Sequence, residues 1–147
     1  MKQNLIFALL ISLFLTLAVF GQSKQSRLDE FLGKSTTTIQ NIWGYPETTE
    51  ITKEGYVKWS YTYQGNINRT FYFSGNYVEI CGSSIILNDY NYAMQLTKEL
   101  ADGFISEGFW VYRSSGNTTT MTNGRVYIDV SILEYKNKYG FILLAYW

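Results

Sequence analysis

The sequence contains no histidine, and this absence excludes more chemistry than any residue that is present. Without imidazole there is no histidine-dependent catalytic triad, no imidazole general base and none of the commonest zinc sites. A single cysteine, Cys81, excludes an intrachain disulfide, so packing alone must stabilise the fold. Cys81 lies in the apolar-flanked run VEICGSSII, which predicts a buried, inert thiol rather than an exposed, reactive one.

Positive charge is also not in excess, because the chain has 12 Lys+Arg and 12 Asp+Glu. No basic stripe is present to neutralise phosphates, so nucleic acid is not an expected partner.

Residues 1–21 combine Lys2 with an apolar run from Leu5 to Phe20, which is typical of a secretory signal peptide. The run is shorter than the roughly 20 residues that span a bilayer, although an uncleaved anchor is the alternative. We expect cleavage near Gly21, no membrane span afterwards, and no lipid anchor because positions 20–23 lack cysteine.

The first half of the exported chain begins with a short helix whose start and end are both marked in the sequence. The spacing of apolar residues predicts this helix over residues 36–43, with Ser35 as its N-cap and Gly44 at its end. After a connection over residues 47–54, alternating aromatic and polar residues predict a strand in which Trp59 anchors the core. The strands expected in this half are residues 57–63, 69–73 and either 77–81 or 84–87.

The second half begins with a longer helix, predicted over residues 90–107 and capped by Asn88 or Asp89. Its apolar face consists of Ala93, Leu96, Leu100 and Phe104. The Asn123-Gly124 pair then gives the strongest hairpin signal in the sequence. The strands expected in this half are residues 109–113, 118–122, 125–135 and 141–147, of which the last is nearly all apolar and should be central or covered.

The order helix, strands, helix, strands indicates an α+β fold in which antiparallel sheet packs on one or two helices. Residues 22–147 are predicted to form a single domain with two structural halves, about 26–87 and 88–147. No proline- or serine-rich linker separates the halves, which favours one domain over the alternative of two.

The stretch from Leu32 to Tyr63 resembles the signature of the SmpA/OmlA (BamE-like) family of small outer-membrane proteins, within a wider group similar to β-lactamase inhibitor proteins. The residues that carry the resemblance are Gly33, Ser35, Ile39, Ile42, Trp43, Gly44, Pro46, Trp59 and Tyr61. The resemblance implies a helix followed by sheet in the N-terminal half, a place in the bacterial cell envelope, and function through binding of a partner protein. The chain lacks the lipid-accepting cysteine of that family and continues well beyond its usual length.

No catalytic, metal or cofactor site is predicted. Paired carboxylates of a glycosidase type would have to come from Glu79, Asp102, Glu107, Asp129 and Glu134, but no spacing selects two of them. Asp129 alternates with the apolar residues of its strand and is expected to point outward. Motifs for a serine nucleophile with a lysine base, or for a glycine-rich phosphate loop, are absent.

The one compositional excess is aromatic, since 18% of residues are aromatic and 13 are tyrosines. So many hydroxyls do not fit a small core, so several tyrosines must lie at the surface, where they favour contacts with proteins and sugars. We therefore expect a non-catalytic, periplasmic or secreted module that binds an envelope protein; the alternatives are a carbohydrate- or small-ligand-binding protein and, third, a small hydrolase. The predicted binding face consists of Tyr61, Tyr63, Tyr72, Tyr127 and Tyr135.

Overall fold

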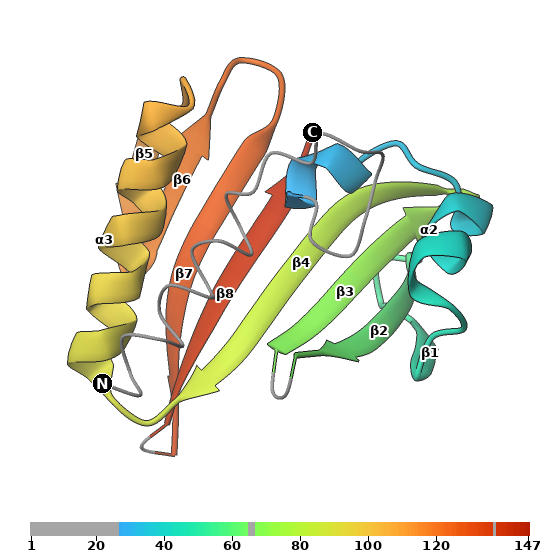
Figure 1. The fold of residues 1–147 in the computed structure, drawn as a ribbon, viewed down its shortest axis with the longest axis horizontal. Coiled ribbons are helices and arrows are strands. Elements are labelled where there is room, and N and C mark those ends of the chain that lie inside the picture. The colour runs from blue at the N-terminus through green and yellow to red at the C-terminus, as the bar shows by residue number, and fades with distance from the viewer. Residues whose placement is uncertain (1–26, 65–66, 137) are drawn as a thin grey trace.

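The computed structural model of the protein describes residues 27–64, 67–136 and 138–147, so the expected signal peptide lies outside the described residues. Its elements in chain order are the 3-10 turn η1 (Leu28–Phe31), α2 (Thr36–Trp43), β1 (Thr48–Ile51), β2 (Val57–Tyr63), β3 (Ile67–Ser74), β4 (Tyr77–Leu87), α3 (Tyr90–Ser106), β5 (Trp110–Ser115), β6 (Thr118–Thr122), β7 (Tyr127–Tyr135) and β8 (Lys138–Tyr146). The eight strands form one antiparallel sheet in the order β1-β2-β3-β4-β8-β7-β6-β5 (Figure 1).

The sheet consists of two four-stranded meanders that meet at their last strands. Strand β4 pairs with β8 over eight residue pairs, from Ile80 opposite Tyr146 to Leu87 opposite Tyr139. The β8 strand is therefore central, as its apolar sequence predicts. Pairing β4 with β8 leaves neither strand with an unpaired edge, and only β1 and β5 remain at the edges of the sheet.

The predicted α+β fold class, with its order of helix, strands, helix, strands, is wrong. Half of the described residues are in strands and a quarter in helices, and the dominant order is four strands, the helix α3, and four strands. The elements before β1 are a four-residue turn and an eight-residue helix, which are too short to form a layer that matches the sheet. Sequence patterns indicated antiparallel sheet packed on one or two helices, and they did not show that pairing of β4 with β8 joins all eight strands into one sheet.

Both predicted helices are confirmed, and their ends follow from local hydrogen bonding. Ser35 Oγ accepts from the Thr38 N–H at 3.1 Å, while Gly44 has φ +82° and its N–H donates to the Gln40 carbonyl at 2.8 Å. Asp89 Oδ1 accepts from the Tyr92 N–H at 3.1 Å at the start of α3. The predicted apolar face of α3 is also confirmed, because Ala93, Leu96, Leu100 and Phe104 are all buried.

Strand boundaries differ from the sequence prediction in several places. Strands β3, β5 and β8 begin and end one to three residues from the predicted 69–73, 109–113 and 141–147, and three further differences have a clear cause. The connection predicted over residues 47–54 contains the edge strand β1, whose four residues are all exposed and so have no hydrophobic period. Residues 77–87 form one strand, β4, rather than one of two alternatives. The hairpin at Asn123-Gly124 is confirmed, but β7 begins at Tyr127 because Asn123 Oδ1 accepts from the N–H groups of both Arg125 and Val126.

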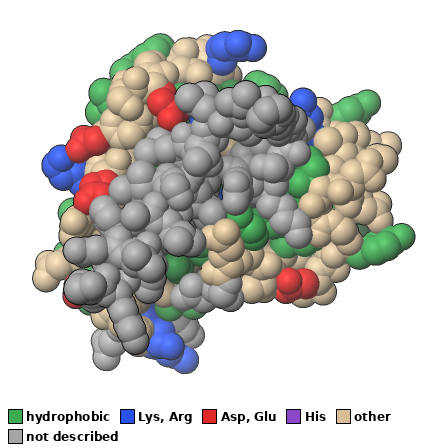
Figure 2. All heavy atoms as spheres, viewed as in Figure 1, with side chains coloured by type: hydrophobic (Ala, Val, Ile, Leu, Met, Phe, Trp, Pro, Cys, Tyr) green, Lys and Arg blue, Asp and Glu red, His purple; other side chains and the backbone are tan. Residues whose placement is uncertain are grey.

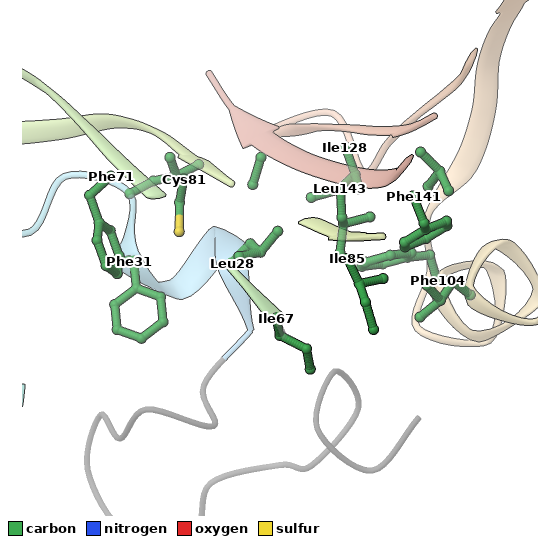
Figure 3. Close-up of a cluster of buried hydrophobic side chains, with 14 of the residues drawn as sticks. Leu28, Phe31, Ile67, Phe71, Cys81, Ile85, Phe104, Ile128, Phe141 and Leu143 are labelled. Atoms are coloured by element: carbon green, nitrogen blue, oxygen red, sulfur yellow. The ribbon is translucent and has the colours of Figure 1, made fainter. Parts of the chain in front are cut away.

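The helical elements lie on one side of the sheet, and the hydrophobic core lies between the two layers (Figures 1 and 3). Trp43 is the centre of an aromatic cluster at the α2 end, with its ring centroid 5.7 Å from that of Phe71 and 6.5 Å from that of Phe31. Trp59, the predicted core anchor, is only partly buried, and its ring lies 4.6 Å from that of Phe73. Packing of α2 on the sheet therefore depends more on Trp43, in the helix itself, than on Trp59 of β2.

The free Cys81 is fully buried, as the apolar residues that flank it predict. Burial raises the pKa of its thiol to about 12, although the nearby Arg69 charge acts in the opposite direction. The thiol therefore stays protonated at neutral pH, and a protonated, buried thiol is a poor nucleophile.

Candidate functional site

The candidate site lies on the side of the sheet that faces away from η1, α2 and α3, which we call the open face (Figure 1). No helix of the described residues covers it. Residues directly opposite each other on antiparallel strands point to the same side, so the strand register arranges the side chains of the open face in rows across the sheet. Residues that are distant in the sequence thereby become neighbours.

One of these rows is mainly aromatic. Tyr72 of β3 lies opposite Ile80 of β4, Ile80 lies opposite Tyr146 of β8, and Tyr146 lies opposite Tyr127 of β7. The rings of Tyr127 and Tyr146 are stacked, with centroids 5.6 Å apart and an interplanar angle of 18°. An irregularity in β5 between Val111 and Arg113 lets Tyr112 extend the row, with its ring 5.5 Å from that of Tyr127. We call Tyr72, Ile80, Tyr146, Tyr127 and Tyr112 the aromatic band.

A hydrogen-bonded polar cluster adjoins the aromatic band. Asp129 Oδ1 accepts from Thr120 Oγ1 at 2.6 Å and from the Tyr146 hydroxyl at 3.2 Å. Arg113 Nε in turn donates to Thr120 Oγ1 at 3.4 Å. Burial, followed by the negative charge of Asp129, raises the pKa of Tyr146, so its hydroxyl stays a proton donor. The cluster thus holds the Asp129 carboxylate in a fixed orientation.

The polar cluster lines a pocket of about 360 Å³ together with Ser115 and Thr118. The second carboxylate oxygen of Asp129 accepts no hydrogen bond from the described side chains, so it can accept one from a ligand hydroxyl or amide. The Arg113 guanidinium, on the exposed strand β5, supplies donors at the opposite side of the pocket. Charge, hydroxyl groups and aromatic rings therefore meet at one position on the open face.

The opposite end of the open face is apolar. Gly140 of β8 lies between Ile86 of β4 and Leu133 of β7, and its missing side chain leaves a hollow there. Ile86 and Leu133 are 61% and 54% exposed, which is high for large aliphatic side chains. The hollow is a pocket of about 260 Å³, which Ser84, Ile85, Lys138 and Ile142 complete. Along β7 the open face therefore presents the apolar hollow at Leu133, the polar cluster at Asp129 and the aromatic band at Tyr127 in succession.

The five tyrosines predicted to form a binding face do not share one surface. Tyr61 is only 4% exposed on the helix-covered side, and its hydroxyl donates to the Gly44 carbonyl at 3.2 Å. Burial raises its pKa to about 12. Tyr63 is on the same side, with its ring 5.3 Å from that of Trp43. Tyr72 and Tyr127 belong to the open face, whereas the side chain of Tyr135 lies outside the part that the structure describes.

Sequence reasoning did not single out Tyr112, Tyr146, Arg113 or Thr120. The near-continuous apolar run of β8 hid the alternation that places Tyr146 on the open face, and the irregularity in β5 cannot be seen in a sequence pattern. Asp129 was expected to point outward, and it does lie on the open face, but its hydrogen bonds come from strands that only the fold brings beside it.

The other carboxylates considered for hydrolysis are dispersed. Asp102 pairs with Lys98 on the exposed surface of α3 at 2.6 Å, and Glu107 pairs with Arg27. Of the five acids considered, Asp129 alone lines one of the described pockets. On the side of the molecule seen in Figure 2, described acidic and basic side chains are interspersed rather than clustered by sign.

Among residues 27–64, 67–136 and 138–147, no group of three or more metal-ligating side chains comes together. Within the same ranges, no helix is both long and apolar enough to cross a bilayer. Comparison of the chain with protein-family models, with curated proteins and with solved structures finds no match.

Proposed function

We propose that this protein is an exported, non-catalytic module of the bacterial cell envelope that binds another protein through the open face of its sheet. The aromatic band is the observation that carries the proposal. Tyrosine and arginine are the residue types most enriched in the energetically dominant parts of protein interfaces, and here Tyr112, Tyr127, Tyr146 and Arg113 lie together. The exposed apolar hollow at Ile86 and Leu133 extends the same surface.

The periplasmic or extracellular setting is supported by the signal-peptide pattern of residues 1–21. The SmpA/OmlA-like pattern over residues 32–63 supports a role among envelope proteins, including the assembly or maintenance of outer-membrane proteins. The charge balance supports a protein partner over nucleic acid, because the chain offers no excess of basic residues for phosphate contacts.

A photo-crosslinking amino acid placed at Tyr127 tests the proposal in the native envelope. We expect a discrete adduct with one envelope protein, because Tyr127 lies in the aromatic band between Tyr146 and Tyr112. The matched control is the same amino acid at Tyr45, which is 86% exposed and lies in the loop between α2 and β1. We also expect Tyr146→Ser to weaken binding of the identified partner by at least about 30-fold, as for a central interface tyrosine.

The identity of the crosslinked protein distinguishes the role of the SmpA/OmlA family from binding of a different envelope protein. Barrel-assembly components in the adduct would support a role in outer-membrane protein assembly. A different envelope partner would retain the binding function without that role. Equal crosslinking from positions 127 and 45, or an adduct that Tyr146→Ser leaves unchanged, would contradict the open face as the binding surface.

Carbohydrate binding is the second candidate, and the pocket at Asp129 favours it. Sugar recognition needs an aromatic face for stacking and a fixed acceptor for hydroxyl groups. Asp129 lines the pocket, and Tyr127 lies two residues away on the same side of β7. We expect Asp129→Asn to lower the affinity for a glycan about tenfold to hundredfold, because a hydrogen bond to a charged acceptor is lost. A glycan array identifies the ligand, and titration of wild type and variant measures the change.

Glu134→Gln is the matched control for this prediction, since it makes the same change of an acid to its amide on the same strand but at an exposed position outside the pocket. If no glycan is retained by the wild type, or if Asp129→Asn binds it equally well, the carbohydrate function is excluded at this site.

A further inference from the structure

Arg69 is a fully buried arginine on the opposite side of the sheet from the open face. It lies on β3 with 0% exposure and is the largest fully buried side chain of the described residues. The strand register places it opposite Tyr61 of β2 and Ser83 of β4. Its guanidinium lies between α2 and η1, with Cζ 5.5 Å from the ring centroid of Trp43 and 5.9 Å from that of Phe31. The charge is thus fixed in place by α2 and η1.

None of the three guanidinium nitrogens of Arg69 has an oxygen or nitrogen atom as hydrogen-bond partner in the described part of the chain, and neither does Ser83 Oγ beside it. The Asp29 carboxylate, which belongs to the neighbouring turn η1, is already taken. Its two oxygens accept from Arg27, Nε to Oδ1 at 2.9 Å and Nη2 to Oδ2 at 2.5 Å. The Cys81 thiol interacts with Arg69 through a weak hydrogen bond and through its charge, both of which lower the thiol pKa, but burial outweighs them. The thiol stays protonated, so it provides Arg69 with no negative charge.

A buried cation without a partner is among the costliest features a core can contain. The attraction of the two aromatic rings offsets only a part of that cost, because each ring carries a quadrupole and no net charge. Arginine is also never deprotonated in a protein, so this site cannot relieve the cost by becoming neutral. The site is therefore electrostatically incomplete until an anion enters it.

We propose that Arg69 and Ser83 bind the carboxylate of a ligand that has an apolar body, such as a fatty acid. The guanidinium fork matches a planar carboxylate with two parallel hydrogen bonds, and Ser83 Oγ can donate a third. A monovalent carboxylate neutralises one guanidinium, whereas a phosphate dianion would leave one buried negative charge unpaired. Ile67 and Phe71 flank Arg69 on the same side of β3, and Leu143 lies opposite Ser83, so the side chains around the site are aliphatic or aromatic and suit an apolar chain.

The element that must move to admit such a ligand is η1. It is a single 3-10 turn of four residues whose N-cap, Arg27, makes no capping hydrogen bond through its side chain. Isolated turns of this kind are marginally stable, so opening η1 costs less than displacing a strand. Phe31, which covers the guanidinium, belongs to this turn. The site is on the helix-covered side, so this inference is independent of binding at the open face.

Titration of the protein, as isolated after export, with dodecanoate below its micelle concentration tests the inference. We expect saturable binding by calorimetry and a rise in the thermal midpoint, while dodecanol, acetate and inorganic phosphate have much smaller effects. Arg69→Met should lower dodecanoate affinity at least about tenfold, since it removes the charged hydrogen bonds and keeps the apolar volume. Without ligand, Arg69→Met should have a higher thermal midpoint than wild type, because an unpaired buried charge is gone.

Arg125→Met is the matched control and should leave dodecanoate binding unchanged, because Arg125 is exposed in the loop between β6 and β7. Equal binding of dodecanoate by wild type and Arg69→Met, or no binding by wild type, would overturn the inference. A response to acetate or phosphate as large as that to dodecanoate would overturn the apolar-body requirement. Misfolding or a lower midpoint of ligand-free Arg69→Met would show that the chain itself already satisfies the guanidinium, which also overturns it.

Discussion

Replacing Phe71 by alanine is expected to lower the free energy of unfolding by about 3–5 kcal/mol. Phe71 has 0% exposure, and its ring lies 5.4 Å from that of Phe31 and 5.9 Å from that of Tyr61. Truncation therefore leaves a cavity whose lining comes from η1, α2 and β2, and rigid rings cannot collapse into it. Because small domains are stable by only about 5–15 kcal/mol, the variant should be close to unfolding at 37 °C.

The matched control for this variant is Tyr72→Ala at the next position of the chain. Tyr72 is an aromatic residue of the same strand, but it lies on the open face and is only partly buried. Its truncation should cost less than about 1.5 kcal/mol, since no closed cavity forms. Equilibrium unfolding in urea measures both changes. A Tyr72→Ala cost equal to that of Phe71→Ala would show that the two sides of β3 are wrongly assigned.

The Phe71→Ala variant also tests whether the two halves form a single domain, as the sequence predicts. If they do, hydrogen exchange of Phe71→Ala should show loss of amide protection in β7 as well as in β3, because the β4–β8 pairing links them in one sheet. Loss confined to residues 27–87 would instead indicate two independently unfolding units.

Replacing Leu100 by alanine is the second substitution with a large expected effect, about 2–5 kcal/mol of the free energy of unfolding. Leu100 has 0% exposure in the apolar face of α3, which covers the C-terminal meander. The helix packs mainly on β7 and β8, with further contacts to β4 and β5, so its stability comes from this packing on the sheet. Loss of one central side chain should therefore weaken attachment of the whole helix.

Met94→Ala is the control on the same helix, since Met94 is 46% exposed and alanine has the higher helix propensity. Its free energy of unfolding should stay within about 0.5 kcal/mol of the wild type. Helix content by circular dichroism and urea unfolding together check both variants. A cost for Leu100→Ala as small as that for Met94→Ala would contradict the packing of α3 on the sheet.

Sequence reasoning was most accurate where the determinants are local. The ends of α2 follow from Ser35 and Gly44, and the buried face of α3 follows from the spacing of its apolar residues, because caps and helical periods depend on residues within one or two turns. It was wrong about fold class because strand number and sheet continuity depend on pairing between distant segments. The edge strand β1 has only exposed residues, so no hydrophobic period marks it.

The candidate site was predicted only in part, for the same reason. Tyr72 and Tyr127 were singled out with Tyr61 and Tyr63, but alternation within a strand cannot say which of two sides the helices cover. Tyr146 joins Asp129 only because β8 pairs with β7 in one particular register, in which Asp129 lies opposite Leu144 and Tyr127 opposite Tyr146. A shift by one residue would turn every one of these side chains to the other side.

The amino-acid sequence by itself determined the helices, their caps, the burial of Cys81 and the lack of histidine chemistry, because these depend on residue type and near neighbours. The tertiary structure alone decided that β4 pairs with β8, that Tyr127, Tyr146 and Asp129 meet on one surface, and that Arg69 is buried without a partner. These features depend on long-range strand register, and local propensity does not encode it.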